Sequence, residues 1–316
     1  MKHRFKFSWE ILLLILIILV CIISSFISPY FLDIVNLLDT TTNFMEKGII
    51  ALSMSYIIIS GNIDISVASN MGMTSAFMGI FYRMGINIWF SALFALLIAT
   101  LGGFFNGFLV TRFKLPSIAV TLGTYGLYRG IAYILLKDTA VGIDNESFLY
   151  LGQGYIGNTP IPFSLVLFII LAITFGLILH KTIFGRYIYA MGNNEQTCRF
   201  SGIPVDRIKR ILFTLSGLMS GLGAIMLSSR LSSIRPDIGV GLELEVIATV
   251  VLGGVSILGG TGNMIGVVLA LFLVGLATYS MNLVNIPSQV ITIIMGLLLI
   301  TTVLLTQIFQ YRERRA

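Results

Sequence analysis

Residues 11–23 read ILLLILIILVCII, a run in which no polar side chain interrupts the apolar ones. Residues 291–305 form a second run that is apolar except for three threonines, and further apolar runs of about 17 residues or more recur between the two. At 1.5 Å per residue, a helix of this length crosses the roughly 30 Å hydrocarbon layer of a bilayer. Neither run alternates apolar and polar residues, as the strands of a membrane β-barrel do. The sequence therefore predicts an all-α, polytopic membrane protein.

The composition of the whole chain agrees with this fold class. Of its 316 residues, 56% are hydrophobic and only 11% are charged, whereas soluble domains carry about 25% charged residues. Residues 1–7 and the apolar run after them resemble a secretory signal, but no small-residue cleavage site follows before Ser28. We therefore expect a retained first helix in a single transmembrane domain that covers residues 1–316.

About ten membrane-spanning helices are predicted. Glycines punctuate the third and crowd the end of the eighth, which leaves open that these two are broken or re-entrant. The predicted helices lie near residues 9–28, 43–60, 65–82, 88–111, 117–136, 162–180, 208–229, 243–258, 263–283 and 287–307.

The distribution of basic residues predicts the orientation. Cytoplasmic loops of membrane proteins retain an excess of Lys and Arg, and an even number of spans places both termini on one side. Most of the 20 basic residues fall on that side, so we expect both termini in the cytoplasm. The net charge of +6 follows from this topology and contact with anionic lipid, and nucleic-acid binding is not needed to explain it.

Two loops are long enough to have a role of their own. Residues 137–162 are polar and rich in turn-forming residues, and we expect an external loop there that forms a small cap. Residues 181–209 form a basic cytoplasmic loop. Within it, the amide side chain of Asn194 followed by Glu195 is a helix-start signal, and Gly202 is a helix-stop signal. This pattern predicts a short helix outside the bilayer.

Glycines form two further patterns. Residues 57–66 and residues 250–258 both place glycine and serine after an apolar run, which is an indication of structural repeats in a transporter. Small residues recur on two helix faces, where they allow close backbone packing without any ligand. These glycines are at positions 102, 103 and 107 and at positions 217, 221 and 223.

The segment GRYIYAMGNNE at residues 185–195, with the later Ser201-Gly202-Ile203, is similar to the coupling segment of the sugar-type permeases of ATP-binding-cassette (ABC) importers. The ribose, rhamnose and autoinducer-2 permeases are members of that family. Residues 60–67 (SGNIDISV) and residues 243–262 also resemble its signatures, so the similarity covers nearly the whole chain. Residues 28–33 (SPYFLD) look closest to the rhamnose permeases, with the autoinducer-2 permeases next.

The resemblance implies a permease subunit in a bacterial inner membrane. Its expected partners are an ABC ATPase subunit, an extracytoplasmic solute-binding protein, and a second permease copy or a sister permease. The helix from Glu195 to Gly202 is expected to contact the ATPase, unless the segment is an ordinary basic loop. Two departures are a Glu-Gln-Thr sequence where Glu-Ala-Ala is typical, and Asn62 in place of a glycine. The expected coupling residues are Gly192, Asn194, Glu195, Ser201, Gly202 and Ile203.

A small set of polar residues is expected to line or gate the translocation pathway. Asp64 is an acid among apolar residues, and a charge near the bilayer centre costs about 3 kcal/mol or more unless it faces protein or water. It either belongs to a polar passage or caps the helix that begins at Ser66. The candidates are Asn62, Asp64, Ser66, Thr121, Thr124 and Glu245.

Three other charged residues leave a choice between function and structure. Glu243 and Glu245 fit a helix start, and Glu245 is the better pathway candidate because it lies deeper in its apolar segment. Arg129 fits either a contact with a polyhydroxylated solute or extension of its side chain to the membrane interface, and the second is favoured.

Two other classes of function compete with an ABC permease. An ion-gradient-driven transporter usually holds several acids or histidines inside its spans, but His3 and His180 are the only histidines and both fall at predicted membrane edges. An intramembrane enzyme is disfavoured because no His-Glu-x-x-His or Gly-x-Ser-x-Gly motif is present. No phosphate-binding loop occurs either, so ATP hydrolysis is expected on a separate subunit. No cofactor or metal site is predicted.

Overall fold

The structure is a computed structural model that describes residues 9–27, 30–287, 289–291, 293–294, 296–297 and 300–301. The described chain is mostly helical, and its two short strands, β1 (Val141–Gly142) and β2 (Ser233–Ile234), pair antiparallel. The helices are α1 (Trp9–Ile27), α2 (Ile34–Thr41), α3 (Met45–Ile59), α4 (Val67–Arg83), α5 (Ile88–Arg112), α6 (Ser117–Leu136), α7 (Glu146–Gln153), α8 (Phe163–Lys181), α9 (Ile183–Asn193), α10 (Glu195–Phe200), α11 (Val205–Arg230), α12 (Leu242–Leu252) and α13 (Met264–Leu283).

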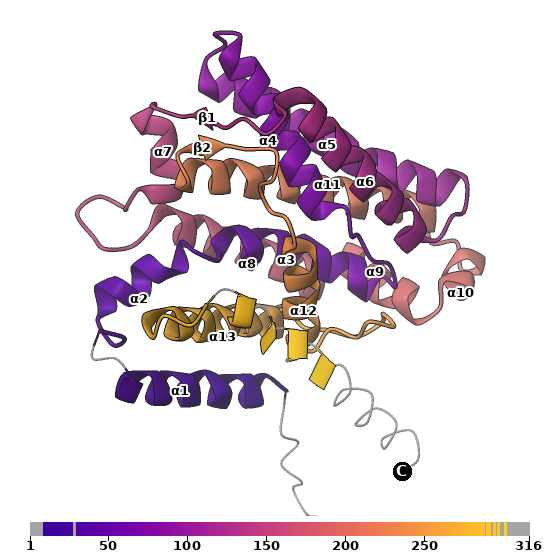
Figure 1. Cartoon of the computed structure of the whole chain (residues 1–316). Helices are drawn as coiled ribbons and strands as arrows, with labels where there is room; N and C mark the ends of the chain where they lie inside the picture. The colour runs from indigo at the N-terminus through magenta and orange to yellow at the C-terminus, as the bar shows by residue number, and fades with distance from the viewer. Residues whose placement is uncertain are drawn as a thin grey trace, which may run out of the picture.

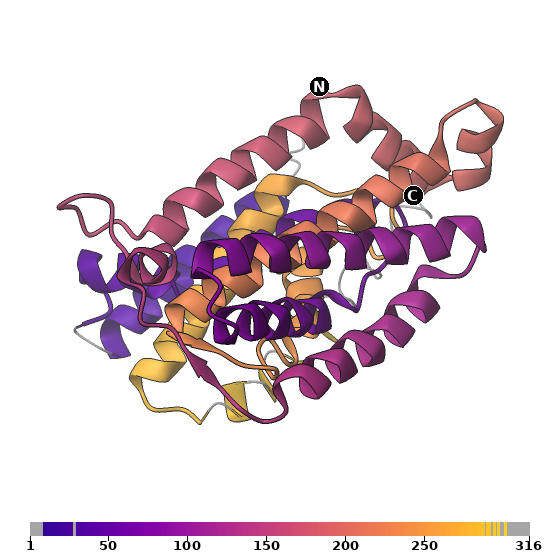
Figure 2. The same ribbon diagram turned by 90° about the horizontal axis from the view of Figure 1, so that it is seen from above.

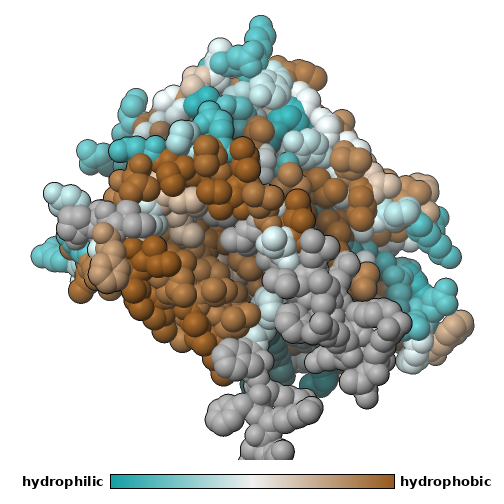
Figure 3. Space-filling model, turned by 60° about the horizontal axis from the view of Figure 1, so that its bottom comes forward, coloured by the Kyte–Doolittle hydropathy of each residue, from teal (hydrophilic) through white to brown (hydrophobic). Residues whose placement is uncertain are grey.

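The long helices form a layered bundle with two distinct ends. In Figure 1, α1 lies at one side of the bundle against α13, and α4, α5, α6 and α11 form the opposite side. Both Figure 1 and Figure 2 place α7 at one end of the bundle and α10 at the other. The face that carries α1 shows a broad apolar area flanked by hydrophilic side chains (Figure 3). Such a surface fits contact with lipid tails.

Helix α3 is the centre of the bundle. Every residue of α3 except Lys47 is buried, so this helix has no polar face. A helix that is apolar all round requires neighbours on every side, and α3 packs against α8, α11, α12 and α13. At its first turn, the buried carboxylate of Glu46 pairs with Arg230 of α11 at 2.9 Å. The helix is therefore held by packing along its length and by an ion pair at one end.

Helices α5 and α11 touch through their backbones. A Cβ atom added at Gly217 would lie 2.4 Å from the Ala99 carbonyl oxygen and 2.8 Å from the Gly103 Cα atom. A Cβ atom at Gly103 would in turn lie 2.2 Å from the Phe213 carbonyl oxygen. The expectation that the glycines on these helices serve close packing is thus confirmed at this pair of positions.

The predicted number of spans is not confirmed. Among the described residues, six helices are long and apolar enough to cross a membrane: α1, α5, α6, α8, α11 and α13. Helices α3 and α4 form where the second and third spans are predicted, but they contain only 15 and 17 residues. Glycines at positions 72 and 79 do not interrupt α4. The predicted span 287–307 falls partly outside the described residues.

The predicted eighth span is broken. It is expected over residues 243–258, but α12 ends at Leu252 because Gly253 and Gly254 turn the chain, with Gly254 in the left-handed region at φ +87°. The amide of Val255 then donates to the Val250 carbonyl. Helix α3 ends with the same hydrogen-bond pattern, since the Asn62 amide donates to the Ile57 carbonyl. The similarity of residues 57–66 to residues 250–258 therefore extends to their backbone conformation.

The sequence analysis misses three helices and shortens a fourth. Helix α2 precedes α3, α7 lies within the predicted external loop, and α9 occupies residues expected to lead into the short cytoplasmic helix. Asn145 caps α7 by accepting the Phe148 amide proton at 3.0 Å, a local signal that the turn-rich composition of its loop obscures. Helix α11 begins at Val205, directly after Pro204, instead of at residue 208.

The glycine contact between α5 and α11 can be tested by adding a single methyl group. We expect Gly217→Ala to destabilise the protein by about 1–3 kcal/mol, because the new Cβ atom collides with the α5 backbone. The control is Gly123→Ala on α6, where nothing lies within 4 Å of an added Cβ atom. Thermal unfolding of the detergent-purified variants measures both effects, and equal melting temperatures would contradict the packing argument.

Candidate functional site

Helix α10 stands out at one end of the bundle and is closed by signals at both of its ends. The Asn194 side chain accepts the Thr197 amide proton at 3.0 Å, which caps the start of the helix. At the other end, Gly202 has φ +78°, and the Ile203 amide donates to the Cys198 carbonyl at 3.0 Å. The Ser201 hydroxyl donates to the Thr197 carbonyl at 2.9 Å. The predicted short helix is confirmed, with Gly202 as the left-handed residue that ends it.

Ion pairs tie α10 to α11. The Glu195 carboxylate accepts from Lys209 Nζ at 2.7 Å and from Arg199 at 2.9 Å, and Arg199 also pairs with Asp206. Partial burial acts to raise the pKa of Glu195, but the hydrogen bonds and charges of Lys209 and Arg199 outweigh burial, so the pKa lies below its usual range. Glu195 is therefore engaged within the chain, and its carboxylate positions α10.

Gly192 lies at a junction of three backbone segments. A Cβ atom there would lie 1.9 Å from the Ile59 carbonyl oxygen at the end of α3 and 2.3 Å from the Gly260 amide nitrogen. The Gly260 amide itself donates to the Ile59 carbonyl at 2.8 Å. A Cβ atom at Gly259 would lie 2.9 Å from the Gly61 Cα atom. We call these four glycines, at positions 61, 192, 259 and 260, the glycine junction.

The most exposed residue of the short helix is an aromatic one that sequence analysis misses. Phe200 is 90% exposed at the end of α10. The rest of this helix, EQTCR, carries polar residues and the buried Cys198. A lone aromatic side chain in such a helix, outside the apolar runs, is the signal that points to Phe200. Aromatic side chains are enriched among the residues that anchor protein interfaces, so Phe200 is a candidate for such a contact.

A second group of predicted residues forms a buried polar cluster at the break between α3 and α4. Asp64 is 2% exposed, and its carboxylate accepts hydrogen bonds from the Ser66 hydroxyl at 2.6 Å, the Ser66 amide at 3.0 Å and the Ser216 hydroxyl of α11 at 2.8 Å. The Ser66 hydroxyl in turn accepts from Asn106 of α5 at 2.8 Å. Tyr128 of α6 donates to the Gly102 carbonyl and to Asn106. Four helices thus meet around one carboxylate.

The structure excludes one of the two roles considered for Asp64, that of the helix cap. The N-cap of α4 is Ser66, whose side chain makes no capping hydrogen bond, and Asp64 lies two residues earlier. Its bond to the Ser66 amide forms a turn before the helix. Asp64 is therefore not the helix cap. Its partner Ser216, and Asn106, which donates to Ser66, come from segments that the sequence analysis does not connect with it.

The remaining pathway candidates form no hydrogen bond with the Asp64 carboxylate in the part of the chain that the structure describes. Asn62 donates to the Ser60 carbonyl and hydroxyl, and Thr124 donates to the Val120 carbonyl within α6. Thr121 donates to the Ser117 carbonyl at 2.9 Å and to the Ile63 carbonyl at 3.3 Å, so it attaches α6 to the break after α3. Each of these side chains satisfies nearby backbone groups.

Glu245 occupies a separate place. It pairs with Lys47 of α3, and its side chain is 41% exposed beside a small hollow that Tyr279 of α13 also lines. Glu243, the neighbour given second place in the sequence analysis, is the buried one at 7% exposure, and its Oε2 atom has no hydrogen-bond partner among the described residues. Glu243 is thus the more buried of the two inside the protein, because α12 begins at Leu242 and turns Glu243 inward.

Arg129 holds the segment before α12. Its guanidinium donates to the carbonyls of Pro236 at 2.6 Å, Ile238 at 3.1 Å and Ala68 at 2.9 Å. The favoured expectation, extension to the membrane interface, is wrong, because three carbonyl groups near the start of α4 and in the segment 231–241 draw the side chain inward. Arg129 is thus a clamp between α4 and α12.

No metal centre is evident in the part of the chain that the structure describes, where no group of three or more His, Cys, Asp or Glu side chains gathers.

Both a family model and individual relatives that are transport permeases match this chain over most of its length. Residues 36–303 match the family described as "Branched-chain amino acid transport system / permease component". Proteins named "Autoinducer 2 import system permease protein LsrD" are similar throughout. The protein of Enterobacter sp. (strain 638) is 35% identical and that of Klebsiella pneumoniae 34% identical, each over 98% of this chain and 95% of the relative. That of Escherichia coli (strain K12) is 32% identical, over 98% of this chain and 96% of the relative. No solved structure matches the chain significantly.

The Arg129 clamp generates a prediction. Arg129→Met removes the donors of three carbonyl bonds, and leaving buried acceptors without partners costs about 1–3 kcal/mol. We expect a lower melting temperature and loss of solute uptake in proteoliposomes. Arg83→Met, whose side chain bonds Thr139 at an exposed site, is the control and should shift stability by no more than about 0.5 kcal/mol. Equal behaviour of the two variants would exclude a clamp.

The tie between α10 and α11 is testable by charge exchange. Glu195→Lys and Lys209→Glu should each raise hydrogen exchange of the amides in residues 194–203, and the double variant should restore much of the protection. Because the pKa of Glu195 is lowered, the tie is fully present above pH 4.5, the ordinary value, and is lost as the pH falls through the lowered pKa. Additive effects in the double variant would show that the two side chains act independently.

Proposed function

The chain belongs to the "Branched-chain amino acid transport system / permease component" family, and we propose that it is the membrane-spanning subunit of an ATP-driven importer for a sugar-like solute. The solute class that we propose is that of autoinducer-2, ribose and rhamnose. The names of its relatives, which are autoinducer-2 import permeases, support this class over nearly the full length of the chain. Membership of a family of ABC importer permeases disfavours a transporter driven by an ion gradient alone.

The observation that carries the proposal is the exposed end of α10. An importer whose membrane subunit lacks a phosphate-binding loop requires a separate ATPase and a rigid surface through which that ATPase can act. Helix α10 offers Phe200 at 90% exposure and is closed by Asn194 and Gly202. Buried aromatic anchors dominate the affinity of many protein interfaces. We therefore assign Phe200 the central contact with the ATPase, with Ser201 and Ile203 at its edge.

The proposed orientation places α10 in the cytoplasm. The two bundle ends differ in charge. Basic side chains that form no ion pair with any residue that the structure describes gather near α9, α10 and the start of α11, among them Lys181, Arg186 and Arg207. An excess of basic residues is typical of cytoplasmic loops. Helix α7 lies at the other end and is then external, where a solute-binding protein docks. In this arrangement the protein spans a bacterial inner membrane about ten times, with both termini in the cytoplasm.

The proposed mechanism is alternating access driven from α10. When two ATPase subunits close on ATP, they displace Phe200 and with it α10. The pair between Glu195 and Lys209 carries that movement to α11, and Gly192 carries it through the glycine junction to the end of α3. Rigid segments that move together are a recurrent basis for such transitions. The cavity for the solute forms between this subunit and a second permease, identical or a sister.

The proposed gate lies at the buried polar cluster. Asp64 receives a hydrogen bond from Ser216 of α11, so a shift of α11 driven from the cytoplasm changes the environment of the carboxylate directly. Ser66 and Asn106 offer further polar groups as the cluster opens. Asn62, Thr121 and Thr124 line the same break between α3 and α4 or face it from α6, whereas Glu245 belongs to the outer part of the pathway, beside Lys47.

Reconstitution with the ATPase encoded beside the permease tests the proposal. Phe200→Ala should weaken ATPase binding by about 30-fold or more, as removal of an interface anchor does. It should also lower uptake and solute-stimulated ATP hydrolysis together. Gly202→Val should uncouple hydrolysis from uptake, because a branched side chain strains the left-handed turn that ends α10.

The matched control is Phe26→Ala, an aromatic residue on α1 that is 87% exposed. It should leave ATPase binding unchanged, since α1 lies away from α10 in the bundle. Wild-type coupling in Phe200→Ala, or uptake by the permease without any ATPase, would refute the proposed function.

A further inference from the structure

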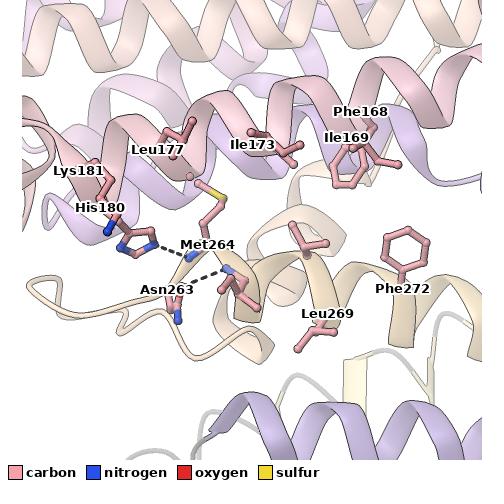
Figure 4. A pocket seen from close by; sticks show the side chains of 14 residues that line it. Phe168, Ile169, Ile173, Leu177, His180, Lys181, Asn263, Met264, Leu269 and Phe272 are labelled. Carbon is pink, nitrogen blue, oxygen red and sulfur yellow. Dashed lines mark hydrogen bonds between the residues drawn. The ribbon is translucent and has the colours of Figure 1, made fainter.

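An apolar groove runs between α8 and α13. Its volume is about 680 Å³, and side chains from both helices line it, among them Phe168, Ile173, Leu269 and Phe272. Figure 4 shows these side chains along the facing sides of the two helices. Both helices are long and apolar enough to span a membrane. The apolar side chains that line the groove therefore suit a hydrocarbon chain better than a polar solute.

The groove has one polar end. His180, Lys181 and Asn263 lie there, at the end of α8 and the start of α13 (Figure 4). His180 and Asn263 also line a neighbouring hollow of about 500 Å³, to which Arg186 and Thr261 contribute. The apolar groove and this hollow thus lie side by side and share two lining residues. Together they combine an apolar wall with donor groups at one end.

The polar end carries cations that have no partner in the part of the chain that the structure describes. Lys181 and Arg186 are exposed, and neither side chain forms an ion pair or a hydrogen bond among the described residues. His180 Nε2 accepts the Met264 amide proton at 3.3 Å, so the neutral ring carries its own proton on Nδ1. The acid at this end is Glu10 of α1, whose carboxylate accepts a hydrogen bond from Asn263 at 2.7 Å.

The dimensions fit one leaflet of a bilayer. From Phe168 to Lys181 the groove follows 13 residues of α8, which is about 20 Å at 1.5 Å per residue. Half of the hydrocarbon layer measures about 15 Å. An acyl chain from one leaflet therefore fills the apolar part, and its phosphate reaches the level of the cations. Basic pockets between membrane helices are known to hold anionic headgroups.

We propose that the groove between α8 and α13 is a binding site for one anionic phospholipid. Its acyl chain lies against Ile173 and Leu269, and its phosphate lies between Lys181 and Arg186. A second protein copy would cover the apolar wall but leave two cations without partners, which is costly for buried charges. Charge complementarity thus selects the anionic lipid. Because Arg186 belongs to α9, the bound headgroup would join α8 to the segment that carries α10.

Native mass spectrometry of the full-length protein tests the site. Phosphatidylglycerol and phosphatidylethanolamine with identical acyl chains are titrated against the detergent-purified chain. We expect tighter binding of phosphatidylglycerol and, in Lys181→Gln/Arg186→Gln, binding about 30-fold weaker, at roughly fivefold to sixfold for each charge. The control Arg112→Gln/Lys114→Gln removes two cations from the turn between α5 and α6, outside the groove, and should bind as the wild type does.

A second pair of variants tests the apolar part. A Cβ atom at Gly176 in the groove meets only Met264, at 3.7 Å, so Gly176→Leu fills the groove without a backbone collision. We expect it to abolish binding of phosphatidylglycerol at the site while Lys181 and Arg186 remain. Gly126→Leu on α6, where nothing lies within 4 Å, is the matched control. Thermal unfolding verifies that each variant is folded, independently of uptake or ATP hydrolysis.

Two results would overturn the inference. Equal affinity for the two lipids, or binding unaffected by the charge and groove variants, would show lipid held without a specific site. A two-chain species that carries no lipid and that Gly176→Leu dissociates would show that a second copy of the chain fills the groove. Neither result would bear on Phe200, because α10 and its variants lie outside the groove.

Discussion

A break in a helix inside a membrane must find a hydrogen-bond partner for every backbone group that it frees, because hydrocarbon offers none. This chain meets that requirement at two breaks in the same manner. After α3 and after α12, a glycine in the left-handed region turns the chain, and the next amide donates back to a carbonyl five residues earlier. Side chains complete the hydrogen bonding. At the first break, Asp64 accepts the Ser66 amide proton. In the irregular segment before α12, Arg129 does the corresponding work by donating to the carbonyls of Pro236 and Ile238. Breaks satisfied in this way allow polar groups such as the Asp64 carboxylate to lie deep in the bundle.

The polar cluster and the end of the bundle that carries α10 are connected by rigid elements. Helix α11 begins beside α10, where Lys209 meets Glu195, and it reaches Ser216 beside Asp64 within two turns. Helix α9 ends at the glycine junction, in contact with α3. The two connections run in parallel, one through an ion pair and one through backbone contact. A displacement of α10 therefore acts on both sides of the break that holds Asp64, and this geometry is what the proposed transport mechanism uses.

Local signals in the sequence predict local structure well, but they do not predict contacts between segments that are distant in the sequence. Asn194 and Gly202 each act within a few residues, so the limits of α10 follow from residue type alone. Apolar runs likewise predict most of the long helices. The partners of Asp64 and Arg129 lie 152 and 107 residues away, and no periodicity in the chain connects them. Arg129 is an example. From its sequence neighbours alone it fits a position at the membrane interface, and only the structure shows that the segment 231–241 lies beside it and accepts its hydrogen bonds. Helix α12 is shorter than predicted because two glycines outweigh the apolar residues around them.

The glycine junction has a consequence for how the subunit responds to force. Side chains normally separate packed helices and yield by rotating about their bonds, so a small displacement of one helix is absorbed before it reaches the next. At Gly192 and Gly260 the peptide groups themselves are in contact, and the Ile59 carbonyl accepts a hydrogen bond from one of them. Such a contact yields less than one between side chains. In the proposed mechanism, the end of α9, the end of α3 and the loop before α13 therefore move together, and a displacement of α9 reaches α3 without being absorbed by side chains between them.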